Sequence, residues 1–295
     1  MLFRSVWTTF EPGTNVVQTG WRDSSTVWLD LEEKDPKKRF KMFRSSPVEG
    51  AVKGSWGLYT FFSGDGIHWG ILFEPLLKAL PESIAPRVVA YPLDRPCEYA
   101  ELLPIVRDAL PKNEPFVLLG ESFSGPLALM AAAEHPEGLV AVILCASFIK
   151  NPVPLVPLWA RVLSRPFLFR FLPLFAQVKA LLGGYSTQAL RTLLARALSQ
   201  ERPAVLAARV QAVLAVNVEA ELRACAVPIL YLAGASDRVV PRKNLREIQR
   251  VKPEIRSVTI PAPHLVLQTR PLESSRAITD FVSSLKTKRS GGNER

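Results

Sequence analysis

A serine on a predicted sharp turn is the residue of this chain best placed to act as a nucleophile. Ser122 lies in Gly-Glu-Ser-Phe-Ser-Gly, between the apolar run Phe116–Leu119 and an Ala- and Leu-rich stretch. That order predicts a strand, a tight turn and a helix, which would hold the hydroxyl above a sheet beside the first N–H groups of the helix. The short pattern alone is weak, because roughly one or two chains of this size in ten carry it by chance.

A serine hydroxyl needs a histidine to accept its proton, and the chain offers three histidines. His135 lies in the Glu-His-Pro-Glu end of a predicted helix, where capping is its ordinary role. His68 follows a Gly-Asp-Gly turn and could line the mouth of a site, but a surface or packing role explains it equally well. His264 follows the predicted strand Arg256–Ile260, at the strand end where parallel sheets carry their sites. We therefore expect His264 to be the base.

The acid that would orient this histidine is Asp237, in the loop that follows a buried strand. It gives the chain order Ser…Asp…His, and the loop after Leu139–Ala146 contains no carboxylate. Each residue also has an ordinary explanation: Ser122 as a helix N-cap, Asp237 as a turn former and His264 as a loop residue. Their occurrence in this order at successive strand ends predicts a catalytic triad.

Acyl transfer by a serine also needs backbone donors for the developing oxyanion. We expect one donor to be the N–H of Phe123, directly after the serine. The second is assigned to Asp65 in the turn Ser63-Gly64-Asp65-Gly66, with Gly66 as the open alternative, because glycines let the backbone approach a substrate closely.

Strands alternate with helices from about residue 70, which predicts an α/β fold with a doubly wound, mostly parallel sheet. We expect the α/β core to comprise 71–150 and 218–285, with the proline-interrupted segment 151–217 inserted between two strands as a helical cap. The polar segment 286–295 is expected to be a disordered tail. The expected strands of the core are Arg87–Tyr91, Phe116–Leu119, Leu139–Ala146, Pro228–Ala233 and Arg256–Ile260.

Composition limits the function classes. The 295 residues are 48% hydrophobic, enough for a large core. The net charge of +10 would attract anionic surfaces, but a solvated basic surface is the plainer interpretation. We find no nucleic-acid module, no zinc spacing, no signal-peptide pattern and no charge-free window long enough for a spanning helix. The cysteines show no pairing pattern, and Cys145 is expected to be a small buried hydrophobe. These features predict a cytoplasmic protein with no metal or organic cofactor, no nucleic-acid partner and no stable membrane insertion.

The segments around Ser122, Asp237 and His264 resemble the α/β-hydrolase superfamily, specifically its small capped serine esterases. Two positions depart from the family pattern: Ser124 replaces the second glycine of the serine turn, and Ser63 replaces the histidine before the oxyanion loop. The resemblance implies hydrolysis of short-to-medium acyl esters through an acyl-enzyme. Thioester, lactone or C–C bond hydrolysis would use the same machinery, and a catalytically silent binding module is the alternative from another class.

The first 70 residues look different, and parts of them resemble blades of β-propeller glycoside hydrolases. Strands are predicted at Thr26–Leu31, Phe40–Phe43 and Trp56–Phe62, too few to close a propeller. We expect 1–70 to be a fused fragment whose strands complete the hydrolase sheet.

The predicted cap is rich in Leu, Phe, Trp and Pro, with basic residues at intervals. It suits an apolar acyl pocket with a cationic rim, and hence a small-molecule ester with an apolar acyl group. A helix packed on the sheet with a solvated basic side is the plainer interpretation. The sequence leaves the oligomeric state open. The basic residues concerned are Arg161, Arg165, Arg170 and Lys179.

Overall fold

The structure is a computed structural model in which the chain divides into two compact units, residues 1–55 and 56–295. The described residues are 16–23, 26–31, 40–44, 56–61, 70–89, 91–92, 94–112, 114–153, 174–199 and 202–290.

The first unit contains a three-stranded antiparallel sheet in the order β1-β2-β3. The strands are β1 (Val16–Asp23), β2 (Thr26–Leu31) and β3 (Phe40–Arg44). The expectation that β2 and β3 complete the parallel sheet is therefore wrong. Only two residues separate β1 from β2, and neighbours joined so closely satisfy their backbone hydrogen bonds in a local hairpin.

The second unit is built on a six-stranded sheet whose strand pairs are all parallel, in the order β5-β4-β6-β7-β8-β9. This confirms the predicted α/β class with its parallel sheet. The chain runs from β4 to β5 on one side and then returns to place β6 on the other side of β4. Such a reversal opens a crevice at the carboxyl ends of the two strands, the usual place for a site. The strands are β4 (Trp56–Phe61), β5 (Ile84–Val89), β6 (Phe116–Glu121), β7 (Leu139–Cys145), β8 (Ile229–Gly234) and β9 (Arg256–Ile260).

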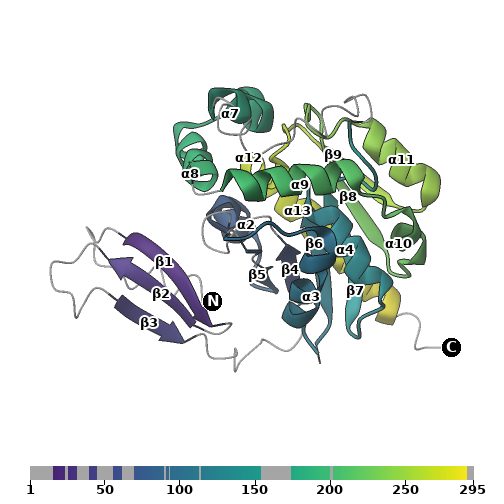
Figure 1. The fold of residues 1–295 in the computed structure, drawn as a ribbon. Coiled ribbons are helices and arrows are strands. Elements are labelled where there is room, and N and C mark those ends of the chain that lie inside the picture. Colours follow the sequence, from purple (N-terminus) through teal and green to yellow (C-terminus); the bar gives the residue numbers. More distant parts are fainter. Residues whose placement is uncertain are drawn as a thin grey trace. The chain divides into compact units, whose positions relative to one another are not determined.

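Helices cover both faces of this sheet (Figure 1). One face packs against α3 (Tyr99–Ala109), α4 (Ser124–Ala133), α10 (Glu219–Ala224) and α11 (Lys243–Val251). The other packs against α2 (Glu74–Ala79), α12 (Val266–Thr269) and α13 (Pro271–Ser290), together with the 3₁₀ helix η1 (Gly70–Phe73).

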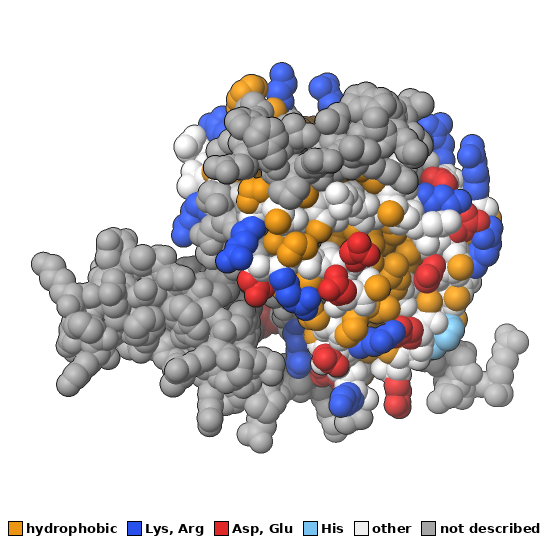
Figure 2. All heavy atoms as spheres, viewed as in Figure 1, with side chains coloured by type: hydrophobic (Ala, Val, Ile, Leu, Met, Phe, Trp, Pro, Cys, Tyr) orange, Lys and Arg blue, Asp and Glu red, His pale blue; other side chains and the backbone are white. Residues whose placement is uncertain are grey.

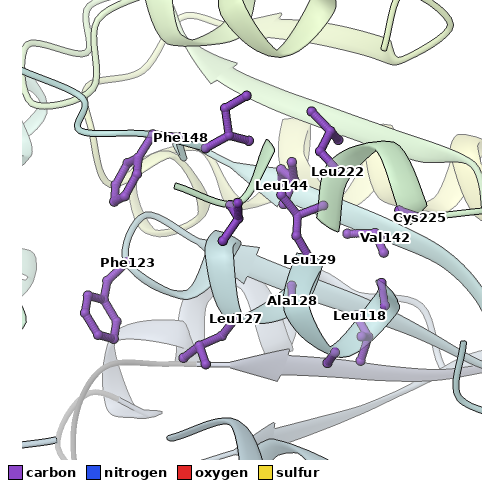
Figure 3. Packing of buried hydrophobic residues seen from close by; sticks show 14 of the residues in the cluster. Leu118, Phe123, Leu127, Ala128, Leu129, Val142, Leu144, Phe148, Leu222 and Cys225 are labelled. Atoms are coloured by element: carbon purple, nitrogen blue, oxygen red, sulfur yellow. The ribbon is translucent and has the colours of Figure 1, made fainter. Parts of the chain in front are cut away.

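The central strands β6 and β7 are buried along their whole length because both of their faces are covered. Leu118 points into the first core with Leu127 and Leu129 of α4, as Figure 3 shows. Val117 and Leu119 point into the second core. Successive residues of β6 thus alternate between the two cores.

The insertion between β7 and β8 is helical in its described part, apart from an isolated bridge between Lys150 and Asn217. It contributes α7 (Leu174–Leu182), η2 (Gly183–Tyr185), α8 (Gln188–Ser199) and α9 (Pro203–Ala215) before α10. Arg202 and Arg209 donate to the carbonyl oxygens of Asp94 and Pro92, in the loop after β5. The expected cap residues Arg161, Arg165 and Arg170 lie outside the described residues.

The last helix, α13, is longer than predicted and continues to Ser290. The expected disordered tail is therefore wrong for residues 286–290. The sequence stays compatible with a helix through Lys286-Thr-Lys-Arg, whose positive charges suit a helix C-terminus, until Gly291-Gly292. Residues 291–295 lie outside the described part of the chain.

The described surface is mixed in charge. On the face shown in Figure 2, basic side chains are spread among acidic and apolar ones and do not gather into one stripe. Within the described part of the chain, no helix has both the length and the apolar character needed to cross a membrane.

Candidate active site

Ser122 lies on the turn between β6 and α4 with a φ of +50°, in the left-handed region that non-glycine residues rarely adopt. The turn is fixed by three hydrogen bonds. The Ser122 N–H donates to the Cys145 carbonyl at 2.8 Å, and the Ser122 carbonyl accepts from the Gly125 N–H at 3.1 Å and from Ser147 Oγ at 2.8 Å. A strained residue persists only where its surroundings hold it, and here they present a hydroxyl above the sheet.

Two glycines let the strand and the helix of this turn meet closely. A Cβ at Gly120 would lie 2.5 Å from the carbonyl oxygen of Ser124, and a Cβ at Gly125 would lie 1.8 Å from Ser147 Oγ. Ser124, which replaces a glycine of the family pattern, is accommodated in the core and accepts a hydrogen bond of 3.2 Å from the Tyr91 hydroxyl. The serine at this position is therefore compatible with close packing of the strand and the helix.

The structure brings together the three residues that the sequence predicts as a triad. His264 Nε2 lies 2.9 Å from Ser122 Oγ, and His264 Nδ1 lies 2.9 Å from Asp237 Oδ2. The other Asp237 oxygen, Oδ1, accepts from the N–H groups of Val239 and Val240 at 2.8 and 2.9 Å. The carboxylate is thus fixed by its own loop, and it can in turn fix the tautomer and orientation of the imidazole.

The topology explains why these side chains lie close together. Ser122, Asp237 and His264 follow β6, β8 and β9, whose carboxyl ends lie at the same edge of the sheet. His264 is 2% exposed, so the imidazole is held among protein groups. His135 lies beyond the C-terminus of α4, at the end of that helix away from Ser122, and its φ of +52° fits a helix-terminating role. His68 lies outside the described residues.

Of the two expected oxyanion donors, only the Phe123 N–H lies within the residues that the structure describes. The N–H of Phe123 has no acceptor among the described residues, while its ring stacks on Tyr99 at 4.6 Å and its carbonyl accepts the Tyr99 hydroxyl at 3.0 Å. Phe61 of β4 pairs with Gly120 of β6, so β4 ends beside the serine turn. Asp65 and Gly66, which follow β4, lie outside the described residues.

Sequence reasoning missed the hydroxyl groups that support the serine turn. Ser147 Oγ holds the carbonyl of Ser122, Tyr99 holds that of Phe123, and Tyr91 reaches Ser124. Burial raises the pKa of both tyrosines, so their hydroxyls stay protonated and can donate. The position of Ser147, two residues after the end of β7, was the available signal, since β7 and β6 end at the same edge of the sheet.

Sequence reasoning also missed a buried acid next to the serine. Glu121 is 7% exposed, and burial raises the pKa of its carboxyl group to about 7, against the hydrogen bond from Gln268, which lowers it. Gln268 Nε2 donates to Glu121 Oε2 at 2.9 Å. No group of three or more histidine, cysteine, aspartate or glutamate side chains in the described residues could hold a metal ion.

The family model for the alpha/beta hydrolase fold matches residues 81–271, and the chain belongs to this family. Comparison with curated proteins gives no match. Neither the family model nor the solved structures support the resemblance of residues 1–70 to a β-propeller glycoside hydrolase.

Solved structures with the same fold include several enzymes at low sequence identity. The enol-lactonase from Burkholderia xenovorans is 17% identical with a TM-score of 0.66, over 79% of this chain and 93% of that one. A lipase-esterase related protein from Clostridium acetobutylicum is 13% identical with a TM-score of 0.64, over 78% and 96%. A thermophilic esterase from Thermogutta terrifontis is 18% identical with a TM-score of 0.60, over 79% and 91%. At these identities the similarity shows the fold alone.

Proposed function

We propose that this protein is a serine carboxylesterase that hydrolyses esters with short-to-medium apolar acyl chains. One observation carries the proposal: a single imidazole, that of His264, lies 2.9 Å from a serine hydroxyl on one side and 2.9 Å from a carboxylate on the other. This is the arrangement in which a histidine can activate a serine for attack on an acyl carbon. Membership of the α/β hydrolase fold family supports it.

The proposed reaction has two halves. Ser122 Oγ attacks the acyl carbon of the ester while His264 Nε2 takes the hydroxyl proton, and Asp237 stabilises the imidazolium that forms. The tetrahedral intermediate then expels the alcohol, which receives the proton from His264, and an acyl-enzyme remains. Water, deprotonated by His264, attacks the acyl-enzyme and releases the carboxylic acid and free Ser122.

The negative oxygen of each intermediate needs hydrogen-bond donors. The Phe123 N–H is suited to this role because it directly follows the nucleophile, precedes α4 and has no acceptor among the described residues. The N-terminus of α4 adds a favourable dipole. We assign the second donor to Asp65, with Gly66 as the alternative, because β4 ends beside the serine turn.

We assign the role of a cap to the helical insertion. Its backbone contacts the histidine loop directly, since the Leu265 N–H donates to the Leu181 carbonyl at 3.2 Å. Its arginines Arg202 and Arg209 reach the loop after β5. The insertion therefore touches loops at the carboxyl edge of the sheet, where a cap would enclose the acyl chain of a small-molecule substrate.

A panel of p-nitrophenyl esters from C2 to C12 tests the proposal on the wild type and on Ser122→Ala. Ser274→Ala is a matched control, because the Ser274 hydroxyl is buried in α13 without a hydrogen-bond partner among the described residues. We expect the wild type and Ser274→Ala to hydrolyse the shorter esters and Ser122→Ala to lose at least about 10³-fold in kcat. Equal rates for wild type and Ser122→Ala would refute the proposal and favour a silent binding module.

Thioesterase, lactonase and C–C hydrolase activities remain the alternatives on the same residues. The structural similarity to an enol-lactonase is a reason to add a lactone to the panel. At 17% identity this similarity shows a shared fold and does not indicate a shared substrate. A thioester of matched acyl length completes the comparison, and the highest kcat/KM assigns the substrate class.

A further inference from the structure

The reaction proposed above does not use the buried acid that precedes its nucleophile. Glu121 is the last residue of β6, and its side chain points to the side of the sheet that carries Val117 and Leu119. It is 7% exposed, on the face of the sheet that also carries the apolar side chains of the second core.

Three groups donate to this carboxylate. Gln268 Nε2 lies 2.9 Å from Oε2, the Leu267 N–H forms a backbone hydrogen bond, and Cys145 Sγ lies 3.9 Å from Oε1. Gln268 is itself only 2% exposed and lies on α12, four residues after His264. The contact therefore joins the strand that carries the nucleophile to the helical turn that follows the base.

The charged and titratable groups around Glu121 come from three other elements. Cys145 lies on β7, and burial raises the pKa of its thiol, so it remains a neutral donor. His264 and Asp237 come from the loops after β9 and β8; a positive charge on His264 lowers the pKa of Glu121, and the charge on Asp237 raises it. No lysine or arginine of the described residues forms an ion pair with Glu121.

A carboxyl group without a cationic partner is a poor choice if this position serves packing alone. Glutamine would fill nearly the same volume and accept through its one amide oxygen, without the free energy needed to bury a charge. Buried acids of this kind gather at reacting centres, where their charge acts on a neighbour. Here the neighbour that becomes positive during the proposed reaction is His264.

Gln268 can serve this acid in both of its protonation states. Its Nε2 donates to the ionised carboxylate, and its Oε1 has no partner among the described residues. With the amide reversed, Oε1 would accept the proton of the neutral acid, so the contact survives titration.

We propose that Glu121 is a positioning residue for the proposed ester hydrolysis, on which this inference rests. With Gln268 it holds the His264 loop against the serine turn, and its ionised carboxylate stabilises the imidazolium formed when Ser122 attacks. Because burial raises the pKa of Glu121 to about 7, the stabilising charge is present above that pH and absent well below it.

The test is kcat measured from about pH 5.5 to pH 9 for the wild type and Glu121→Gln, on the best p-nitrophenyl ester. Glu121→Gln keeps the size and one of the two acceptor oxygens but removes the charge. We expect similar kcat values at the acid end and a roughly tenfold lower kcat for the variant above pH 8, with KM little changed. Ile278→Val, a core substitution in α13, controls for a general loss of stability and should leave the pH profile in place.

Gln268→Leu provides a second, independent measurement that also decides the question if Glu121→Gln fails to fold. Loss of the Gln268 donor raises the pKa of Glu121, so the rise in kcat that follows ionisation of Glu121 should move to higher pH. A ratio of wild type to Glu121→Gln that is constant with pH, or an unmoved profile for Gln268→Leu, would overturn the inference while the hydrolase proposal stands. Equal activity of wild type and Ser122→Ala would instead remove the hydrolase proposal and this inference with it.

Discussion

The hydroxyl of Ser147 occupies the space that a side chain at Gly125 would need, and it uses that space to hold the carbonyl of Ser122. Its Oγ lies 2.8 Å from that carbonyl oxygen, whereas a Cβ on Gly125 would lie 1.8 Å from the same Oγ. Gly125 and Ser147 therefore depend on each other. The missing side chain at Gly125 leaves room for the Ser147 hydroxyl, which fixes the strained turn.

Gly125→Ala is expected to lower the free energy of unfolding by more than about 2 kcal/mol, because the new methyl group overlaps Ser147. Ser147→Gly removes both crowding atoms and leaves only ordinary contact with Leu144 at 3.5 Å. The double variant should therefore be more stable than the sum of the two single losses predicts, by about 1 kcal/mol or more. Urea unfolding of the four proteins measures the coupling, and strict additivity would show that the two side chains do not compete for this space.

Asp237→Asn should reduce kcat by about 10³-fold or more while changing KM little. The amide keeps the shape of the side chain, but it cannot stabilise the imidazolium and it favours the wrong tautomer of His264. Steady-state kinetics with a p-nitrophenyl ester measures the loss, and circular dichroism verifies the fold. Retention of near-wild-type kcat would mean that the contact between His264 and Asp237 has no part in the reaction.

Glu121→Gln should stabilise the protein, and the gain should grow with pH. The ordinary pKa of the carboxyl is 4.5 and burial raises it to about 7 in the fold. Between these values the unfolded chain loses a proton that the folded chain keeps, so the stability of the wild type falls as pH rises from 4.5 to 7 and then levels off. Above pH 7, Glu121→Gln should therefore exceed the wild type in free energy of unfolding by about 3 kcal/mol.

Thermal or urea unfolding of both proteins at about pH 4.5 and pH 8 measures this gain. A stability difference that is the same at both pH values would show that Glu121 titrates normally. A gain in stability together with a loss of kcat at high pH is the combination expected of an acid retained for function.

The sequence predicted the triad because each member follows a predicted strand, and in a parallel sheet the carboxyl ends of strands share one edge. Ser122, Asp237 and His264 could therefore be placed together without knowing the packing of any helix. The supporting contacts could not be predicted in this way. The alternation along β6 puts Glu121 on the same face as Val117 and Leu119, but only the tertiary fold brings Gln268 of α12 over that face.

The wrong assignment of β2 and β3 has a different cause, which is competition between local and long-range strand pairing. β2 and β3 have the composition of sheet strands, and the sequence does not state which partner each strand takes. The short connection between β1 and β2 favours a hairpin over entry into the parallel sheet. The end of α13 is hard to predict because charged residues at a helix C-terminus resemble a polar tail, and only the glycines after Ser290 mark the end of the helix.

If Ser122 is the nucleophile, an acyl-enzyme must form on its Oγ, and a burst experiment detects that intermediate. A slowly deacylating p-nitrophenyl ester is mixed with the wild type and with Ser122→Ala, and the Ser122 peptide is examined by mass spectrometry. We expect a burst of about one equivalent of p-nitrophenol and an acyl group on Ser122 in the wild type, with neither in the variant. Hydrolysis at the same rate by both proteins, with no acyl group on Ser122, would contradict it.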